Sequence, residues 1–176
     1  MKISNYFLAF LTTFLLYSAT VSAQTIGISV GEADYDGEAD DDSLTIAASF
    51  SISESLSFEL SYNDLGEVSA SGDGATITLG AETLDFLIVG LFPINEKVNL
   101  FGKVGVSMWE LDVELTDGFT TLSGEEDGTD LTYATGLEIA INDNLSGNVQ
   151  WQRVQAELDG EDVDVDKISL GLSFDL

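Results

Sequence analysis

The feature that most constrains the fold is a repeated alternation of apolar and small polar residues. In the final segment the two kinds take turns at every position from Lys167 to Leu176. A period of two places successive side chains on opposite faces of a β-strand. The pattern recurs along the chain and predicts strands over 25–35, 43–53, 56–68, 75–92, 98–115, 130–141, 145–157 and 164–176.

The less apolar face of these segments distinguishes between the classes of all-β protein. It consists mostly of Ser, Thr, Ala and Gly, with isolated charges such as Glu59, Glu138 and Lys167. Small polar residues with a few ions suit a crowded barrel interior whose outer face meets lipid. A soluble lipocalin-like carrier, the alternative, would need the apolar face inside and a charged face outside. We therefore predict an all-β, eight-stranded antiparallel up-and-down transmembrane β-barrel.

The connections between the predicted strands alternate in length. Tight turns at 53–55, 95–97 and 142–144 alternate with longer acidic links at 36–42, 69–74, 116–129 and 159–163. Short turns facing the periplasm and longer loops facing the exterior are typical of outer-membrane barrels. An even number of strands then places both termini on the periplasmic side.

Two of the predicted strands change parity along their length. In 98–115 the apolar face shifts between Val106 and Trp109, and in 75–92 it shifts between Leu79 and Leu84. A β-bulge in each strand would restore the facing. Alternatively, the upper ends of these strands project beyond the membrane.

The N-terminus has the three parts of a secretory signal peptide. Lys2 supplies the positive start, an apolar stretch runs from Tyr6 to Tyr17, and Val21-Ser22-Ala23 supplies the small residues before cleavage. The apolar stretch is too short for an uncleaved membrane anchor. We predict a signal peptide over 1–23, a barrel domain over 24–176, and export to the cell outer membrane.

Charge limits the partners. The net charge is −27, and every acidic residue follows the predicted signal peptide, against four basic residues there: Lys97, Lys103, Arg153 and Lys167. Such a chain is not expected to bind nucleic acid, which requires clustered basic residues. The expected partners are outer-membrane lipid and lipopolysaccharide, with diffuse Ca²⁺ or Mg²⁺ at the acidic loops.

No specific metal site or cofactor is predicted. The chain has no cysteine, and acidic residues alternate from Asp34 to Asp40 as in a calcium loop. An EF-hand beginning at Asp34 needs Gly at its sixth position and Glu at its twelfth. Those positions hold Ala39 and Thr45.

Two stretches resemble the OmpA-like transmembrane barrels: Leu91 to Gly105, which begins LFPINEKVNLFGK, and Ala134 to Asn144. The resemblance implies an eight-stranded barrel. It covers the barrel without the peptidoglycan-binding domain of OmpA, so a role in tethering the cell wall is not carried over. The final strand resembles the signal read by the outer-membrane assembly machinery, with Leu in place of the usual final Phe. The signal residues are Ser169, Gly171, Phe174 and Leu176.

The predicted facing directs five charged side chains into the lumen: Glu59, Asp85, Lys103, Glu138 and Lys167. Buried ions must pair, because an unpaired one costs several kcal/mol. OmpA-like barrels resemble this chain in having a lumen salt-bridge network, which is sometimes proposed to gate a small pore. The other interpretation is that ion pairs only fill and pin the barrel. An eight-stranded barrel is just filled by side chains, so a general porin is not predicted.

An enzyme is not predicted either. The chain has no histidine, which removes the Ser-His dyad and the imidazole base. The predicted function is a structural or surface-interaction role with acidic extracellular loops, and the alternative is an adhesin or resistance-type binding barrel. Six aromatic residues are expected on the lipid face or at its rims: Phe86, Phe92, Trp109, Tyr133, Trp151 and Phe174.

Overall fold

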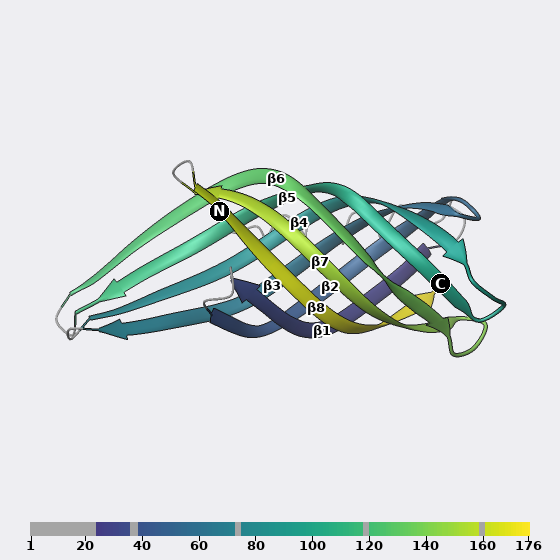
Figure 1. Ribbon diagram of the computed structural model, residues 1–176, viewed down its shortest axis with the longest axis horizontal. Helices are drawn as coiled ribbons and strands as arrows, with labels where there is room; N and C mark the ends of the chain where they lie inside the picture. Colours follow the sequence, from purple (N-terminus) through teal and green to yellow (C-terminus); the bar gives the residue numbers. More distant parts are fainter. Residues whose placement is uncertain (1–23, 36–38, 73–74, 118–119, 159–160) are drawn as a thin grey trace.

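The structure is a closed antiparallel barrel. The computed structural model describes residues 24–35, 39–72, 75–117, 120–158 and 161–176. Each strand pairs with the next, and the last pairs with the first, which closes the ring (Figure 1). The predicted fold class is confirmed. The strands are β1 (Gln24–Tyr35), β2 (Ala39–Ser53), β3 (Leu56–Gly72), β4 (Ala75–Pro93), β5 (Val98–Thr116), β6 (Thr121–Ala140), β7 (Leu145–Leu158) and β8 (Glu161–Asp175).

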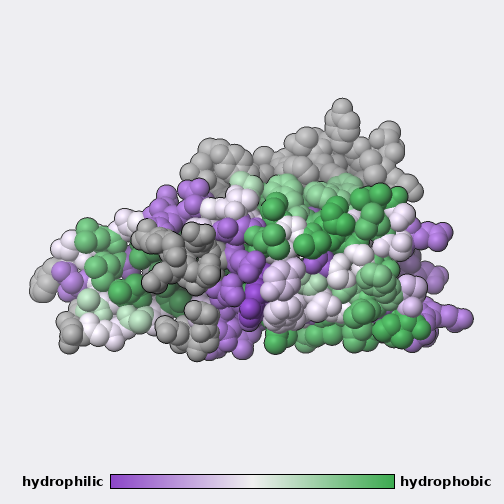
Figure 2. All heavy atoms as spheres, turned by 45° about the horizontal axis from the view of Figure 1, so that its top comes forward, coloured by the Kyte–Doolittle hydropathy of each residue, from purple (hydrophilic) through white to green (hydrophobic). Residues whose placement is uncertain are grey.

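The outer wall of the barrel carries an apolar band. On β6 the band runs from Leu131 to Ile141, and on β8 it runs from Ile168 to Leu176, with large apolar side chains exposed along both. These spans approach the roughly 9–11 residues of a transmembrane strand. Figure 2 shows this hydrophobic surface bordered on both sides by hydrophilic residues. In the described part of the chain, no helix is long and apolar enough to cross a membrane.

Tight turns close one end of the barrel, here called the turn end. Asn95 Oδ1 accepts hydrogen bonds from the backbone N–H groups of Lys97 and Val98, at 2.9 and 3.0 Å. Asn142 holds the turn before β7 in the same way, through the N–H of Asn144. Asparagine side chains commonly stabilise turns by such local hydrogen bonds. The strands β1 and β8 bring the start and finish of the barrel to this same end (Figure 1).

At the opposite end, the expected acidic loops are mostly strand. The segment 116–129 was expected to be a loop, but β6 begins at Thr121 and pairs with β5 from Thr116↔Thr121 onward. This prediction was wrong because Gly, Asp and Glu are depleted in strands, and hydrogen bonding to the neighbouring strand overrides that preference. The extended ends of β3, β4, β5 and β6 run well beyond the other strands (Figure 1). We call residues 67–72, 75–82, 109–116 and 121–131 the projecting sheet.

The parity changes in β4 and β5 come from this projection. The two strands pair without a shift from Thr76↔Thr116 to Pro93↔Asn99. Of the two explanations that the sequence left open, the projecting strand ends therefore hold and the bulges in these strands do not. The bulge lies instead in β3, where the register shifts between Asp64 and Glu67. Gly66 within it has a φ of 80°, which only glycine adopts without strain. Below the projection the apolar face of the sheet meets lipid, and within the projection the apolar face is the opposite one.

Candidate functional site

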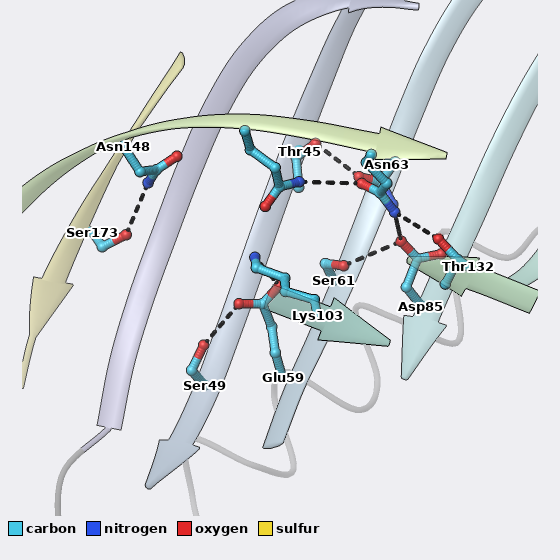
Figure 3. Close-up of polar contacts among 12 residues, drawn as sticks. Thr45, Ser49, Glu59, Ser61, Asn63, Asp85, Lys103, Thr132, Asn148 and Ser173 are labelled. Carbon is cyan, nitrogen blue, oxygen red and sulfur yellow. Dashed lines mark hydrogen bonds and ion pairs between the residues drawn. The ribbon is translucent and has the colours of Figure 1, made fainter. Parts of the chain in front are cut away.

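Asp85 lies at the centre of a polar network that fills the middle of the lumen. Its side chain is fully buried, with 0% exposed. Oδ1 accepts a hydrogen bond from Ser107 Oγ at 2.6 Å. Oδ2 accepts from Asn63 Nδ2 at 2.8 Å, Gln152 Nε2 at 2.7 Å and Ser61 Oγ at 3.4 Å (Figure 3). The donors come from β3, β5 and β7, so one carboxylate ties together three other strands of the wall.

Lys167 on β8 is the cation of this network, and 2% of it is exposed. Its Nζ donates to Thr45 Oγ1 at 2.9 Å and also to Asn63 Oδ1. Asn63 therefore accepts from the lysine with its oxygen and donates to Asp85 with its nitrogen. An amide can serve both charges because it carries an acceptor and donors on one side chain.

A second pair of charges lies closer to the turn end. Lys103 Nζ is 2.7 Å from Glu59 Oε1, and Ser49 Oγ donates to the other carboxylate oxygen at 3.1 Å. Glu138 is apart from both groups and accepts a hydrogen bond from Asn99 Nδ2 at 3.0 Å. The five inward charges named from the sequence thus fall into three groups: the Asp85–Lys167 network, the Glu59–Lys103 ion pair, and Glu138.

An apolar layer covers this network on the side of the projecting sheet. Buried Leu65 packs with Ala33, Ala81 and Val165, and Tyr35 and Leu111 pack against them. Trp109 is also buried, with 6% exposed, and its Nε1 donates to Asp130 Oδ2 at 2.7 Å. Trp109 was expected on the lipid face or at its rims. That prediction was wrong, because β5 continues without a bulge and Trp109 lies on the inner face where the strand leaves the apolar band.

Two cavities lie in the described part of the lumen, and the larger is at the turn end. A cavity of about 520 Å³ opens there, lined in part by Glu59, Lys103 and Glu138. A smaller cavity of about 50 Å³ lies deeper, between Lys103 and Gln152. The lumen is therefore a vestibule that ends at the polar network and the apolar layer.

The outer wall has a sharp chemical boundary where the apolar band ends. On six strands the next outward residue is a carboxylate, and we call this set the acidic rim: Glu32, Asp42, Asp64, Glu82, Glu110 and Asp166. Asp64 lies opposite Glu82, which lies opposite Glu110. Like charges directly opposite across strands are destabilising.

One basic residue lies on the same level. Arg153 on β7 binds Asp166 at 2.5 Å and Asp164 at 3.1 Å. The hydrogen bond from Arg153 lowers the pKa of the Asp166 carboxyl. The carboxylates on β3, β4 and β5 lie on strands that do not pair with the strand of this arginine.

The projecting sheet has two unlike faces. On the face that continues the outer wall, the carboxylate oxygens of Glu110, Asp112 and Glu125 lie within 4.8 Å of one another. The face that continues the lumen is mostly apolar, with Glu126 as an exception, and Ile77 and Leu122 on it are 45% and 64% exposed. Hydrophobic surface is visible again near the far end of these strands in Figure 2. The sheet is therefore an acidic surface backed by an apolar one.

Comparison with known proteins identifies the family. The model of the outer membrane protein beta-barrel domain matches residues 7–175. The chain belongs to this family. As a member of the outer-membrane β-barrel family, it is a membrane protein of the cell outer membrane. No curated protein matches the chain.

Solved structures similar to this outer-membrane β-barrel show the same fold at low sequence identity. Ail, the attachment invasion locus protein of Yersinia pestis, solved in complex with the heparin analogue sucrose octasulfate, is 19% identical with a TM-score of 0.61. That alignment covers 89% of this chain and 100% of Ail. Neisserial surface protein A is 15% identical with a TM-score of 0.63, over 86% of this chain and 96% of its own. The N-terminal barrel of Pseudomonas aeruginosa OprF is 12% identical with a TM-score of 0.61, over 86% and 97%.

Several residues of the lumen network were not named from the sequence. Thr45, Asn63 and Gln152 are neutral, and the search for inward charges passed over them. The signal that was available is their place in the alternation, because all three lie at inward positions of their strands.

Two predictions remain without a structural test. The proposed cleavage after Ala23 lies outside the described residues. Of the four residues of the proposed assembly signal, Phe174 and Leu176 are exposed on the outer wall, and Ser169 and Gly171 face inward on β8.

Proposed function

We propose that this barrel is a closed anchor that holds an acidic platform outside the cell, for interaction with partners there. The turn end faces the periplasm, and the projecting sheet faces the exterior. The observation that carries the proposal is the continuation of four strands beyond the apolar band as a sheet of unlike faces. A purely structural barrel has no need of this extension.

The lumen supports an anchor rather than a channel. Asp85 and Lys167 are hydrogen-bonded to neutral side chains in the centre, and Leu65 and Trp109 close the side of the projecting sheet. Side chains just fill a barrel of this size. These groups act as ties between strands, and no catalytic role is proposed for them.

The chemistry of the platform points to cationic partners. Ail binds a sulfated heparin analogue. The projecting sheet here has no lysine or arginine at all, while Glu110, Asp112, Glu114, Glu125 and Asp127 lie on one face of it. Polyanions are repelled by such a surface and basic partners are attracted. An adhesin-type role is therefore proposed only for basic partners.

The acidic rim is proposed to meet the lipopolysaccharide headgroups. Both surfaces are anionic, so contact requires bridging cations, for which Ca²⁺ and Mg²⁺ are suited by their preference for oxygen ligands. The C-terminal residues are proposed to engage the assembly machinery during insertion.

A trimmed barrel tests the function. The change replaces residues 68–79 and 111–126, each of which is bounded by paired residues, with an Asn-Gly turn that favours a two-residue hairpin. Cells with the full barrel are expected to bind polylysine-coated beads, and cells with the trimmed barrel to bind far fewer. Neither is expected to bind heparin-coated beads.

The trimmed barrel must first be recovered in the outer membrane. On a gel, the unheated sample must migrate faster than the boiled one, which establishes that the trimmed barrel has folded. Equal bead binding by the two kinds of cell would overturn the interaction role. In that case, cells that lack the whole gene and have become sensitive to detergent would indicate that the barrel has a structural role in the envelope.

A further inference from the structure

The vestibule at the turn end has the size and the lining of a ligand site. Its volume is about 520 Å³, and pockets for small molecules measure about 300–1,000 Å³ and occur in the mouths of β-barrels. We propose that the vestibule binds a small amphipathic amine, which lays its apolar part on one wall and places its ammonium group at Glu138. The vestibule lies at the opposite end of the barrel from the projecting sheet, so this site does not depend on the proposed function.

The vestibule has two unlike walls. Val89 and Leu91 lie at successive inward positions of β4, and Phe101 lies opposite Leu91 on β5, which makes this wall apolar. Across the ring, β1, β2 and β8 contribute small hydroxyl side chains: Thr25, Ser49, Ser51 and Ser173. Water alone leaves the apolar wall without a matching surface. A molecule with one apolar and one polar side matches both walls.

The Glu59–Lys103 ion pair forms the floor of the vestibule. The two side chains are 10% and 13% exposed, and both residues also line the smaller cavity beneath. An ammonium group has three hydrogen-bond donors. Among the described residues, Lys103 uses one of them on Glu59 (Figure 3). The floor can therefore donate to a carbonyl or hydroxyl oxygen of a bound molecule.

Glu138 supplies a negative charge nearer the mouth. It accepts a hydrogen bond from Asn99 Nδ2, and no lysine or arginine of the described residues forms an ion pair with it. A carboxylate has about four acceptor positions, so it can take an ammonium group as well as the amide. Glu54 adds a second negative charge at the mouth, and Lys103 is balanced by Glu59. The vestibule is therefore anionic and attracts cations.

The two polar anchors lie at different depths, with the apolar wall between them. Glu138 pairs with Asn99, and Lys103 follows four positions further along β5, a rise of roughly 13 Å at strand spacing. Phe101 lies midway between them on the same strand. The ligand is therefore elongated, with its ammonium group at the mouth, its apolar part on Phe101 and a neutral oxygen toward Lys103. A carboxylate in that last place would add an unbalanced negative charge beside Glu59.

The test uses the mature chain in lipid nanodiscs and leucyl-leucinamide as the probe. This compound carries one ammonium group, two apolar side chains and neutral carbonyl groups. N-acetyl-leucyl-leucinamide lacks the ammonium group, and glycyl-glycinamide lacks the apolar side chains. The backbone amide signals of the barrel are followed by NMR during titration with each compound.

Leucyl-leucinamide is expected to shift the signals of Phe101, Lys103 and Glu138 and to leave those of 109–116 in place. It is expected to bind about fivefold more tightly than the acetylated compound, the effect of one partly exposed ion pair. Its advantage over glycyl-glycinamide is expected to exceed about tenfold, because the leucine side chains cover the apolar wall.

Two charge variants locate the ammonium group. Glu138→Gln keeps an acceptor for Asn99 and removes the charge from the vestibule. Glu96→Gln removes the same charge from an exposed turn at the same end of the barrel, outside the lining of the cavity. The first is expected to weaken leucyl-leucinamide binding about fivefold and to leave the acetylated compound unaffected. The second is expected to leave both affinities within about twofold.

A filled vestibule tests the cavity itself. Ser51 is an exposed, inward residue of the hydroxyl wall, so Ser51→Phe occupies the mouth without removing a buried contact. Val149→Phe adds a ring to the outer wall of β7, where Val149 is already exposed. Ser51→Phe is expected to abolish binding and Val149→Phe to retain it. Each variant must migrate faster unheated than boiled, which establishes that it has folded.

Equal binding of the acetylated compound, equal weakening by Glu138→Gln and Glu96→Gln, or undiminished binding to Ser51→Phe would each overturn the inference. Signal shifts confined to the projecting sheet would place the amine on the acidic platform and overturn it as well. Failure of the bead experiment would remove the proposed function and leave the vestibule site standing, because the two lie at opposite ends of the barrel.

Discussion

At the scale of single residues, Asn63 has the most consequential position in the lumen. It separates a buried lysine from a buried aspartate and bonds to both. A direct ion pair would join only Lys167 to Asp85. The amide of Asn63 bonds to both of them and also donates to Thr83 Oγ1, at 2.8 Å. Four strands are tied together by the contacts of this one neutral side chain.

Replacement of Asn63 by Leu is expected to be costly. The change keeps the volume but leaves Lys167 without one acceptor and Asp85 without one donor, a loss of roughly 2–5 kcal/mol in the free energy of unfolding. Urea unfolding in lipid vesicles, followed by tryptophan fluorescence, measures it. Asn148→Leu is the matched control, because Asn148 makes a longer 3.4 Å bond to Ser173 beside the open vestibule. Equal losses in the two variants would contradict the role assigned to Asn63.

Asp41 gives the edge of β3 a pH dependence. The backbone N–H groups of Glu67 and Asp42 hold the pKa of the Asp41 carboxyl below its usual value. A lowered folded-state pKa means that the bond is fully present above the usual pKa of about 3.9 and is lost as the pH falls through the folded value. Faster amide exchange at Glu67 below about pH 4, relative to exchange at Val89, is the expected result. Asp41→Asn should show fast exchange at Glu67 already at pH 7.

The alternation of residues indicates which side chains face the lumen as long as the strand lies within the apolar band. Glu59, Lys103 and Lys167 follow from simple alternation, because one side of each strand faces lipid and the other the lumen. Trp109 does not, since it lies where the surroundings of the sheet change while its register continues. The polar hubs Asn63 and Gln152 depend on contacts across several strands, which a single segment of sequence does not contain.

At the scale of elements, the two ends of the strands differ in how well sequence defines them. At the turn end, Asn95 and Asn142 each close a tight turn with their own side chains. The far ends are defined by pairing between segments, as for 121–130 against 107–116. Local composition describes those acidic stretches as loop, and only the partner strand makes them sheet.

The bulge in β3 is expected to depend on its glycine. In Gly66→Ala the new Cβ would lie 2.6 Å from Asp41 Oδ2 and 2.7 Å from the Asp42 carbonyl oxygen, at a φ of 80°. The strain is expected to cost about 1–3 kcal/mol of unfolding free energy. Gly72→Ala is the control, because nothing lies within 4 Å of its added Cβ. A Gly66→Ala barrel as stable as Gly72→Ala would show that the bulge adapts.

At the scale of the whole molecule, the orientation in the membrane can be read by labelling. An epitope inserted between Asp117 and Thr120 is expected to bind antibody on intact cells, because the projecting sheet faces outward. The same epitope inserted in the turn 142–144 is expected to bind only after the outer membrane is opened. The opposite result would invert the barrel and remove the basis of the proposed function.

Closure of the ring also has a simple signature. A detergent-extracted barrel with all neighbours hydrogen-bonded is expected to keep its shape in an unheated gel and to migrate faster than the boiled chain. Recovery as a soluble protein with no shift on heating would contradict the membrane location.

The acidic rim has a consequence for how deeply the barrel is immersed. Each carboxylate drawn into hydrocarbon would cost up to a few kcal/mol, and the rim places one on most strands just past the last apolar side chain. Sinking by a single residue pair would submerge several of them at once, and tilting would submerge those on one flank. The rim therefore acts as a depth stop, which sets the height at which the projecting sheet emerges from the surrounding sugars.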